Sequence, residues 1–349
     1  MSQESAVMQY NLREHTLGQM LGQGGYGAVL LAHPNENPNF KFAVKEMSPM
    51  NKADRKKIQL EIDIHRQLTQ LGTKYFIDFL GFDEEISEER GWSVSMFMEF
   101  APNKSVKYLI DTAEVELTSE FAHRLFRELM SAVNFMHQHN YIHGDIKPDN
   151  MLLDKDQHLK LADFGSSRVQ IGDQKAKASE ISFSGDYGAP ELLSLGKVNG
   201  RCTDVFAAGV TFFEMLTGTR PWKRAYNGDS EFQDWKSGKT DTNQAKWSTL
   251  SEQEVIFFRH VLTAESKRRP SAQWMLDFSF TEPTAPIPSS SSSQPVAEVA
   301  TSVQQKKGRK RRAHDETPID TPDVSVEPKQ ETQPKLQKEN DDPITEQQA

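Results

Sequence analysis

Cysteine is almost absent from this sequence of 349 residues, in which Cys202 is the only one. A single cysteine excludes a disulfide within the chain, as is typical of proteins of a reducing compartment. Long apolar runs are also missing, because the longest, from Val205 to Leu216, is too short to cross a bilayer and contains Glu214. The first ten residues lack the apolar core of a secretory signal. We therefore expect a protein of the nucleus or cytoplasm without a membrane segment.

The sequence also lacks an excess of positive charge. Its 41 Lys and Arg residues are outnumbered by 50 Asp and Glu residues, which gives a formal net charge of −9. A protein of this charge has no general attraction for the phosphate backbone, so we expect no direct nucleic-acid binding. The pattern G-x-x-x-x-G-K-[ST] is also absent, which excludes a P-loop nucleotide hydrolase.

Aromatic residues stop abruptly near residue 281. From there to Ala349 the chain has no Phe, Tyr or Trp and is rich in Gln, Glu, Lys, Pro, Ser and Thr. Such a composition buries too little apolar surface to offset the loss of chain entropy, so residues 281–349 are predicted to be a disordered tail. Three parts are expected: an N-terminal extension over 1–14, a folded body over 15–280, and the tail.

Within the body, the spacing of apolar residues changes along the chain. Residues 52–71 carry apolar side chains three or four apart, which predicts a helix, and a second apolar stripe runs from Ser119 toward Asn140. Strands are predicted before and between these helices, at 17–31, 40–46, 76–82 and 93–99. The order indicates an α+β fold, with a small strand-rich part that has one main helix followed by a larger helical part.

The first strands contain a glycine-rich turn. Residues 21–29 read LGQGGYGAV and place Gly22, Gly24 and Gly27 in the pattern G-x-G-x-x-G. Glycine lets backbone N–H groups approach phosphate oxygens closely. The motif is weak by itself, since a glycine-rich hairpin without a ligand has the same pattern. The residues that follow look like a strand and a turn, whereas a dinucleotide-binding fold requires a helix there.

More specific segments follow in order. Lys45 ends an Ala-Val-Lys triplet on the strand after the glycine-rich turn, and Glu61 lies in the middle of the next predicted helix. The sequences HGDIKPDN at 143–150, DFG at 163–165 and APE at 189–191 come next. Together these segments resemble the signature set of the protein kinases. The resemblance covers about residues 17–280 and implies a bilobal fold, with an N-lobe over about 15–99 and a C-lobe over about 102–280.

This resemblance implies ATP and Mg²⁺ as cofactors. Lys45 would hold the α- and β-phosphates, with Glu61 as the anion that fixes its flexible side chain. Asn150 and Asp163 would supply the oxygen ligands that Mg²⁺ prefers. The remaining ATP contacts would come from the glycine-rich loop, the neighbouring strands and the hinge, namely Leu21, Gly22, Gln23, Gly24, Gly25, Tyr26, Gly27, Val29, Ala43, Glu99 and Ala101.

The same resemblance assigns the chemistry of transfer. Asp145 would accept the proton of the substrate hydroxyl, and Lys147 would stabilise the moving phosphoryl group. Ser184 stands where serine/threonine kinases have a hydroxyl that braces these two residues. Asp204 matches the aspartate that ties down the catalytic loop, and Arg269 matches the arginine that pairs with the glutamate of the APE segment.

The region from Arg220 to Trp247, with its Pro-Trp and Asp-Trp-Lys sequences, resembles the checkpoint kinase one family, a DNA-damage group. The helix segment EIDIHRQL is similar too, and there we expect His65 to be a hydrogen-bonded core histidine. Ser105 replaces an acidic residue of that family, so a preference for arginine upstream of the phosphorylated residue should be weaker. We expect no counterpart of the family's C-terminal autoinhibitory domain, because the tail is too short and too polar to fold as one.

One departure leaves an alternative open. The usual His-Arg-Asp of the catalytic loop reads His-Gly-Asp, with Gly144 in place of an arginine that binds a phosphate on the activation loop. We therefore expect that no loop phosphorylation is needed. Gly144 also favours an alternative, a pseudokinase that serves as a scaffold, although every residue that the chemistry requires is present. A small-molecule kinase is disfavoured by the complete peptide-docking segment around the APE sequence.

The tail carries one basic run that resembles a nuclear localisation signal. A solvated charge cluster would have the same composition. If the run is a signal, the chain binds an import receptor and is located in the nucleus. The residues concerned are Lys306, Lys307, Arg309, Lys310, Arg311 and Arg312.

Overall fold

The computed structural model describes residues 11–24, 27–87, 91–172, 174–181, 183–242 and 245–280. The predicted tail over 281–349, with its basic run, lies outside the described residues, as do residues 1–10 of the predicted N-terminal extension. Within the described ranges, no helix combines the length and the apolar character needed to cross a membrane.

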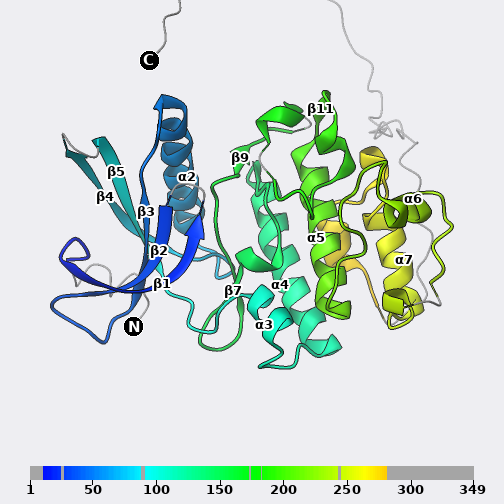
Figure 1. Cartoon of the computed structure of the whole chain (residues 1–349), viewed down its shortest axis with the longest axis horizontal. Helices are drawn as coiled ribbons and strands as arrows, with labels where there is room; N and C mark the ends of the chain where they lie inside the picture. The colour runs from blue at the N-terminus through cyan, green and yellow to red at the C-terminus, as the bar shows by residue number, and fades with distance from the viewer. Residues whose placement is uncertain are drawn as a thin grey trace, which may run out of the picture. The chain divides into compact units, whose positions relative to one another are not determined.

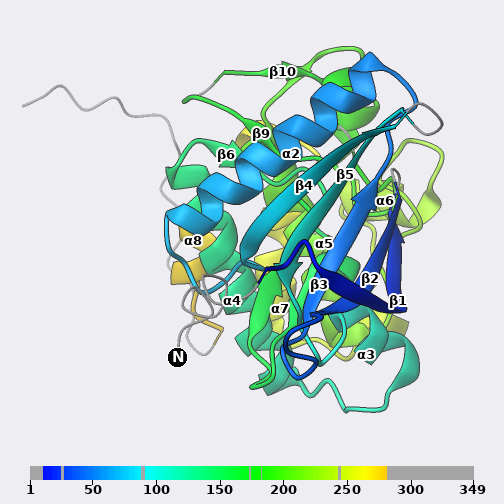
Figure 2. The same cartoon turned by 90° about the vertical axis from the view of Figure 1, so that its left-hand side faces the viewer.

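The N-terminal part is a five-stranded antiparallel sheet with the order β1-β2-β3-β5-β4. Its strands are β1 His15–Gly24, β2 Gly27–Pro34, β3 Phe42–Met47, β4 Phe79–Ser87 and β5 Gly91–Glu99. Helix α2, Lys52–Gln70, packs across one face of this sheet, as Figure 2 shows. Asn51 caps it, because the side-chain oxygen accepts from the backbone N–H groups of Ala53 (2.9 Å) and Asp54 (3.0 Å).

Alternation along β3 sorts its side chains between two cores. Phe42 and Val44 point into one cluster with Phe97, whereas Met47 points the other way, into the cluster beneath α2. Lys45 shares the parity of Met47 and therefore faces α2. The sheet register thus sets the direction of the one lysine that the sequence singles out on this strand.

The C-terminal part is helical and contains the largest core (Figure 1). Its helices are α3 Val106–Thr112, α4 Ser119–Gln138, α5 Gly200–Thr217, α6 Ser230–Lys236, α7 Glu252–Val261 and α8 Ala272–Asp277. Its short strands are β6 Tyr141–Ile142, β7 Met151–Leu153, β8 Leu159–Leu161, β9 Arg168–Val169, β10 Ala176–Lys177 and β11 Lys197–Val198. The 3₁₀ turns are η1 Pro148–Asn150, η2 Ala178–Glu180, η3 Pro190–Leu193, η4 Ala245–Trp247 and η5 Ser266–Arg268.

This architecture confirms the predicted α+β fold, a strand-rich N-terminal part with one main helix and a helical C-terminal part. One strand begins later than predicted: β4 starts at Phe79, whereas the prediction began at residue 76. Phe76 is instead buried and forms an isolated bridge with Leu161 of β8. The apolar character of this segment therefore comes from its contact with the C-terminal core.

Candidate active site

Lys45 joins three parts of the molecule. Its ammonium Nζ lies 2.5 Å from Oε1 of Glu61 on α2 and 3.0 Å from Oδ1 of Asp163, which follows β8. Glu61 reaches it because the buried stripe of α2, which includes Ile58 and Ile62, faces the sheet. The sheet, α2 and the C-terminal part therefore meet at one cation, and the structure brings together three of the predicted site residues.

Lys45 stabilises the charge of both carboxylates, whereas burial raises the pKa of Glu61 and the neighbouring Asp163 adds to this rise. Burial by itself would lower the pKa of Lys45, but the carboxylates of Glu61 and Asp163 outweigh it and raise this pKa above its ordinary value. Partial desolvation would raise the pKa of Asp163, but the Lys45 ammonium holds it below the usual range. Lys45 is thus a fixed cation at neutral pH, and Asp163 is an anion.

Asp163 is held by the residue that follows it. Its backbone has φ +63°, in the left-handed region, and Phe164 is buried at 1% exposure. The Phe164 ring contacts His65 with ring centroids 4.8 Å apart, and it contacts His143 at 5.6 Å and Phe76 at 5.7 Å. This packing fixes the turn and so the position of the Asp163 carboxylate.

His65 is the hydrogen-bonded core histidine that the sequence led us to expect. Its Nε2–H donates to the carbonyl oxygen of Ile77 over 2.7 Å. Burial lowers the pKa of His65 to about 4. The ring is therefore neutral at pH 7 and links α2 to the segment before β4.

The catalytic loop is tied to the start of α5. Asp204 on α5 accepts the backbone N–H groups of His143 (2.9 Å) and Gly144 (2.8 Å), and His137 of α4 lies 2.9 Å from its carboxylate. Gly144 has φ +83°, where glycine is free of strain. A Cβ there would also lie 2.7 Å from the Ser166 carbonyl oxygen. The sequence departure at Gly144 therefore fits a backbone that suits glycine.

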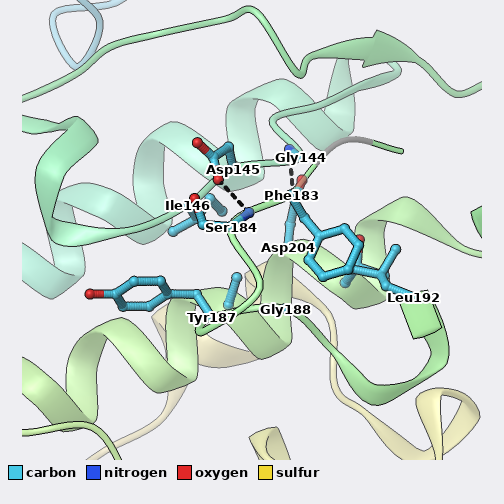
Figure 3. A pocket seen from close by; sticks show the side chains of 11 residues that line it. Gly144, Asp145, Ile146, Phe183, Ser184, Tyr187, Gly188, Leu192 and Asp204 are labelled. Atoms are coloured by element: carbon cyan, nitrogen blue, oxygen red, sulfur yellow. Dashed lines mark hydrogen bonds between the residues drawn. The ribbon is translucent and has the colours of Figure 1, made fainter. Parts of the chain in front are cut away.

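Asp145 contacts Lys147, Ser184 and Asn150, and Figure 3 shows its contact with Ser184. Lys147 Nζ lies 2.7 Å from Asp145 Oδ2 and 2.8 Å from the hydroxyl oxygen of Ser184. The backbone N–H of Ser184 donates to Asp145 Oδ1 over 2.9 Å. The side-chain amide of Asn150 donates to the Asp145 carbonyl oxygen over 2.8 Å. Both carboxylate oxygens are thus oriented, and the carboxylate stays open on one side.

A small pocket opens beside this carboxylate. It lies between the catalytic loop, the segment 183–188 and the first turns of α5 (Figure 3). Phe183 and Gly188 shape it together, because a Cβ on Gly188 would lie 2.3 Å from the Phe183 ring. The pocket has room for about one water molecule beside Asp145.

The predicted nucleotide contacts lie on the strands next to Lys45. Leu21, Gly22, Gln23 and Gly24 end β1, Gly27 and Val29 begin β2, Ala43 lies on β3, and Glu99 and Ala101 stand at and after the end of β5. A Cβ on Gly24 would lie 3.8 Å from Lys45 Cε, so the glycine-rich turn passes over the lysine. Gly25 and Tyr26 lie outside the described residues. The individual adenine contacts stay predictions.

Residues present at this site fit a phosphate chain and a hard cation. Lys45 supplies the charge for the phosphates, and bare glycines lie above it. Asn150 uses its amide N–H₂ toward Asp145, so its side-chain oxygen is available, and Asp163 adds a carboxylate. Oxygen donors of this kind are the ligands that Mg²⁺ prefers.

Sequence reasoning missed one buried pair next to the hinge. Lys160 of β8 lies 2.9 Å from the Glu99 carboxylate, which also accepts the backbone N–H of Asp78 over 3.1 Å. The pair ties the end of β5 to the C-terminal part. No sequence signal marked it, because Lys160 sits between two leucines on a short strand and looks like a solvent-facing residue.

The predicted structural pair of the APE segment forms as expected. Arg269 binds both carboxylate oxygens of Glu191, over 2.5 and 2.7 Å, and its guanidinium lies 4.7 Å from the Phe206 ring centroid. This forked contact is the geometry that arginine provides and lysine does not. It fixes the base of the segment that carries Ser184.

Comparison with known proteins agrees with this geometry. The protein kinase domain family model matches residues 15–281. The serine/threonine-protein kinase chk-1 of Caenorhabditis briggsae is 30% identical over 256 residues, which covers 72% of this chain and 50% of the relative. The serine/threonine-protein kinase SBK1 of Danio rerio is 31% identical over 278 residues, which covers 74% of this chain and 68% of the relative.

A yeast relative gives a similar result. The serine/threonine-protein kinase CHK1 of Saccharomyces cerevisiae is 28% identical over 272 residues, which covers 74% of this chain and 49% of the relative. The chain thus spans about half the length of the checkpoint-kinase relatives it matches. With the family model matched over more than half of the chain, this protein belongs to the protein kinase family.

Proposed function

We propose that this chain is a serine/threonine protein kinase that transfers the γ-phosphoryl group of ATP to a hydroxyl of a protein substrate. One observation carries the proposal: the Asp145 carboxylate is oriented at both oxygens by Lys147, Ser184 and the loop around them. A carboxylate held in this way accepts the proton of an incoming hydroxyl and aims its oxygen at the phosphorus.

Lys147 and Lys45 would stabilise different phosphate groups. Lys147 contacts Asp145 and Ser184, so its ammonium stands where negative charge passes from donor to acceptor. Lys45 is fixed by Glu61 and would neutralise the phosphates that stay on the donor. Asn150 and Asp163 would hold Mg²⁺, which supplies neutralisation of the phosphate charge when bound.

Serine or threonine is the proposed acceptor for three reasons. Lys147 is followed by Pro148, a pair that resembles the serine/threonine branch of the family. The relatives from Caenorhabditis briggsae and Danio rerio are also named serine/threonine kinases. Ser184 completes the argument, since its hydroxyl braces Lys147 as that branch requires.

The scaffold alternative predicts that the fold persists without turnover. The features that favoured it were Gly144 and the pair Phe206-Ala207, which replaces the usual Trp-Ser after Asp204. The backbone N–H of Gly144 nevertheless binds Asp204, as a working catalytic loop needs, and Asp145 next to it is fully supported. The geometry therefore favours turnover.

The test is transfer of labelled phosphate from Mg·ATP to a degenerate serine/threonine peptide library, with Asp145→Asn as the matched control. We expect incorporation by the native chain and none by the variant. Binding of Mg·ATP without incorporation by the native chain would contradict the proposal and support the scaffold.

We further infer a checkpoint-kinase-like role in the nucleus. It rests on the sequence from Arg220 to Trp247, on the chk-1 relatives and on the basic run in the tail. A fluorescent fusion of the full chain should enter nuclei. A fusion in which Lys310, Arg311 and Arg312 are changed to alanine should not, and equal nuclear entry of both would contradict this assignment.

A further inference from the structure

The segment after α5 brings basic side chains to the loop that carries Ser184. Arg220 pairs with Asp186 over 2.9 Å, and its guanidinium lies 5.5 Å from the Tyr187 ring centroid. The guanidinium of Arg224 lies against the backbone of Gly185. Gly185 directly follows Ser184, which contacts both Asp145 and Lys147. Arg224 therefore stands one residue away from a group that touches the proposed catalytic base.

Glycine at 185 is what allows this approach. A Cβ at that position would lie 2.6 Å from an Nη of Arg224 and 3.0 Å from its Cζ. Nearly any side chain at 185 would thus push the guanidinium away from the loop. Glycine at 185 thus lets the Arg224 guanidinium lie against the segment that follows Ser184.

The acids near this loop are already satisfied within the chain. Asp186 pairs with Arg220, as described. The buried Glu214 binds Lys107 over 3.1 Å through one oxygen and accepts the Tyr187 hydroxyl over 2.6 Å through the other. Neither carboxylate is left to attract a basic residue of a substrate.

Asp229 and Glu231 are the remaining acids close to Arg224 in sequence, and Glu231 pairs with Lys246 over 2.6 Å. Asp229 is held by the backbone. One of its oxygens accepts the backbone N–H groups of Lys223 and Arg224, over 3.2 Å each, and the other caps α6 at Phe232 over 3.0 Å. It makes no side-chain ion pair with Arg224. Within the described part of the chain, the exposed guanidinium of Arg224 has no carboxylate partner.

We propose that Arg224 is a specificity-determining residue that binds an anionic group of the protein substrate next to the residue to be phosphorylated. The group is either a carboxylate of Asp or Glu or the phosphate of a residue phosphorylated earlier. Both present oxygens to the two-pronged guanidinium, and the phosphate carries more charge. This inference rests on the proposed kinase function and assigns a substrate class to it.

The test uses the full chain and sets of three serine peptides. Within a set the peptides are identical except at one position near the acceptor serine, which is Gln, Glu or phosphoserine, and each set tests a different position. For the native chain, we expect kcat/KM for the Glu peptide to be about threefold higher than kcat/KM for the Gln peptide. With phosphoserine at the best position, the expected gain is about tenfold. Arg224→Gln should bring these ratios to about one, and Arg224→Glu should invert them. Lys236→Gln, which removes an exposed cation of α6, should keep the native ratios.

A binding measurement separates this inference from the proposed function. Fluorescence anisotropy of the same labelled peptides does not require turnover. Tighter binding of the anionic peptides that is lost in Arg224→Gln supports the inference even if no phosphate is transferred. Transfer at equal kcat/KM to all three peptides would overturn it while leaving the kinase proposal intact. Ratios that are unchanged in Arg224→Gln would also overturn it, since another cation would then be responsible.

Discussion

Ser184 contacts the catalytic pair through both its backbone and its side chain. Its hydroxyl is one of two oxygen partners of the Lys147 ammonium, and its N–H binds Asp145. Ser184→Ala keeps the N–H and removes only the hydroxyl. We expect kcat to fall about tenfold with little change in the KM for ATP, because a charged hydrogen bond is worth about 1.4 kcal/mol or more.

Ser184→Thr is the matched control and should keep most of the rate, since it retains the hydroxyl. The measurement is steady-state transfer at varied ATP for all three proteins. Equal kcat for the alanine variant and the native chain would show that Lys147 is positioned by Asp145 alone.

His65 makes stability depend on pH. Its pKa is about 4 in the folded protein, below the ordinary 6.5, so the unfolded chain binds more protons between these values. Stability is therefore present above pH 6.5 and is lost as the pH falls toward 4. One such group contributes a loss of about 2 kcal/mol between pH 7 and pH 5.

Urea unfolding at both pH values, for the native chain and for His65→Leu, checks this expectation. The variant loses the bond to Ile77 and is less stable at pH 7, but its stability should fall less steeply toward pH 5. Identical slopes for the two proteins would mean that His65 does not titrate as its burial implies.

At the scale of elements, the catalytic loop depends on glycine at 144. A non-glycine residue in the left-handed region costs about 1–2 kcal/mol, and here a Cβ would also press on the Ser166 carbonyl oxygen. Gly218, the C-cap of α5, has φ +74° with open space around its Cβ position. Gly144→Ala should therefore lower the free energy of unfolding more than Gly218→Ala does, by about 1 kcal/mol or more. Chemical denaturation of the two variants measures the difference in the free energy of unfolding. Equal losses in the two variants would contradict the close approach of a Cβ at 144 to the Ser166 carbonyl oxygen.

The activation segment, between Asp163 and Glu191, is held by hydrogen bonds of Gln170 and Arg201 that involve no phosphate. The Gln170 side chain donates to Asn199 over 2.7 Å and accepts the Gly200 N–H over 2.8 Å. Arg201 donates to Asn140 over 3.0 Å and to the Gln170 carbonyl over 3.3 Å. Pairing of β10 with β11 anchors the segment further along.

Phosphatase treatment should consequently leave the transfer rate unchanged. Gln170→Ala should lower it, whereas Gln174→Ala, at an exposed position of the same segment, should not. A large loss of rate after phosphatase treatment, with a phosphosite between Asp163 and Glu191, would contradict this account.

The elements differ in how far the sequence foretold them. Apolar spacing predicted α2, α4 and the strands of the sheet, because each carries buried apolar side chains at the regular period of a helix or a strand. It did not foretell the anchor at Gln170 or the pair of Lys160 with Glu99. These are single polar residues whose partners lie far away in the sequence, so no local period records them. The site motifs were recognisable by family likeness alone, and their distances became known with the fold.

Across the whole molecule, the site exists only where the sheet, α2 and the helical part meet. The Lys45 ammonium is the link, through Glu61 and Asp163. Glu61→Gln removes one charge of a buried pair and should lower the free energy of unfolding of the protein by about 3 kcal/mol or more. Transfer should fall with it, because Lys45 is then held only by Asp163.

Urea unfolding measures the loss of stability in Glu61→Gln, and kcat/KM for ATP measures the loss of transfer. Glu84→Gln, at an exposed position of β4, is the control for both. Unchanged stability and rate in Glu61→Gln would mean that the pair is dispensable for coupling the two parts. Loss in the control as well would point to a general effect of charge removal from the N-terminal part.

We propose that Asp145 carries the chemistry of phosphoryl transfer while other residues hold the nucleotide. The most direct test is the single-turnover rate of transfer from bound Mg·ATP in Asp145→Asn, with ATP affinity measured on the same sample. We expect native ATP affinity and a transfer rate that is lower by about a thousandfold or more. A variant that binds ATP normally and transfers phosphate at the native rate would contradict it.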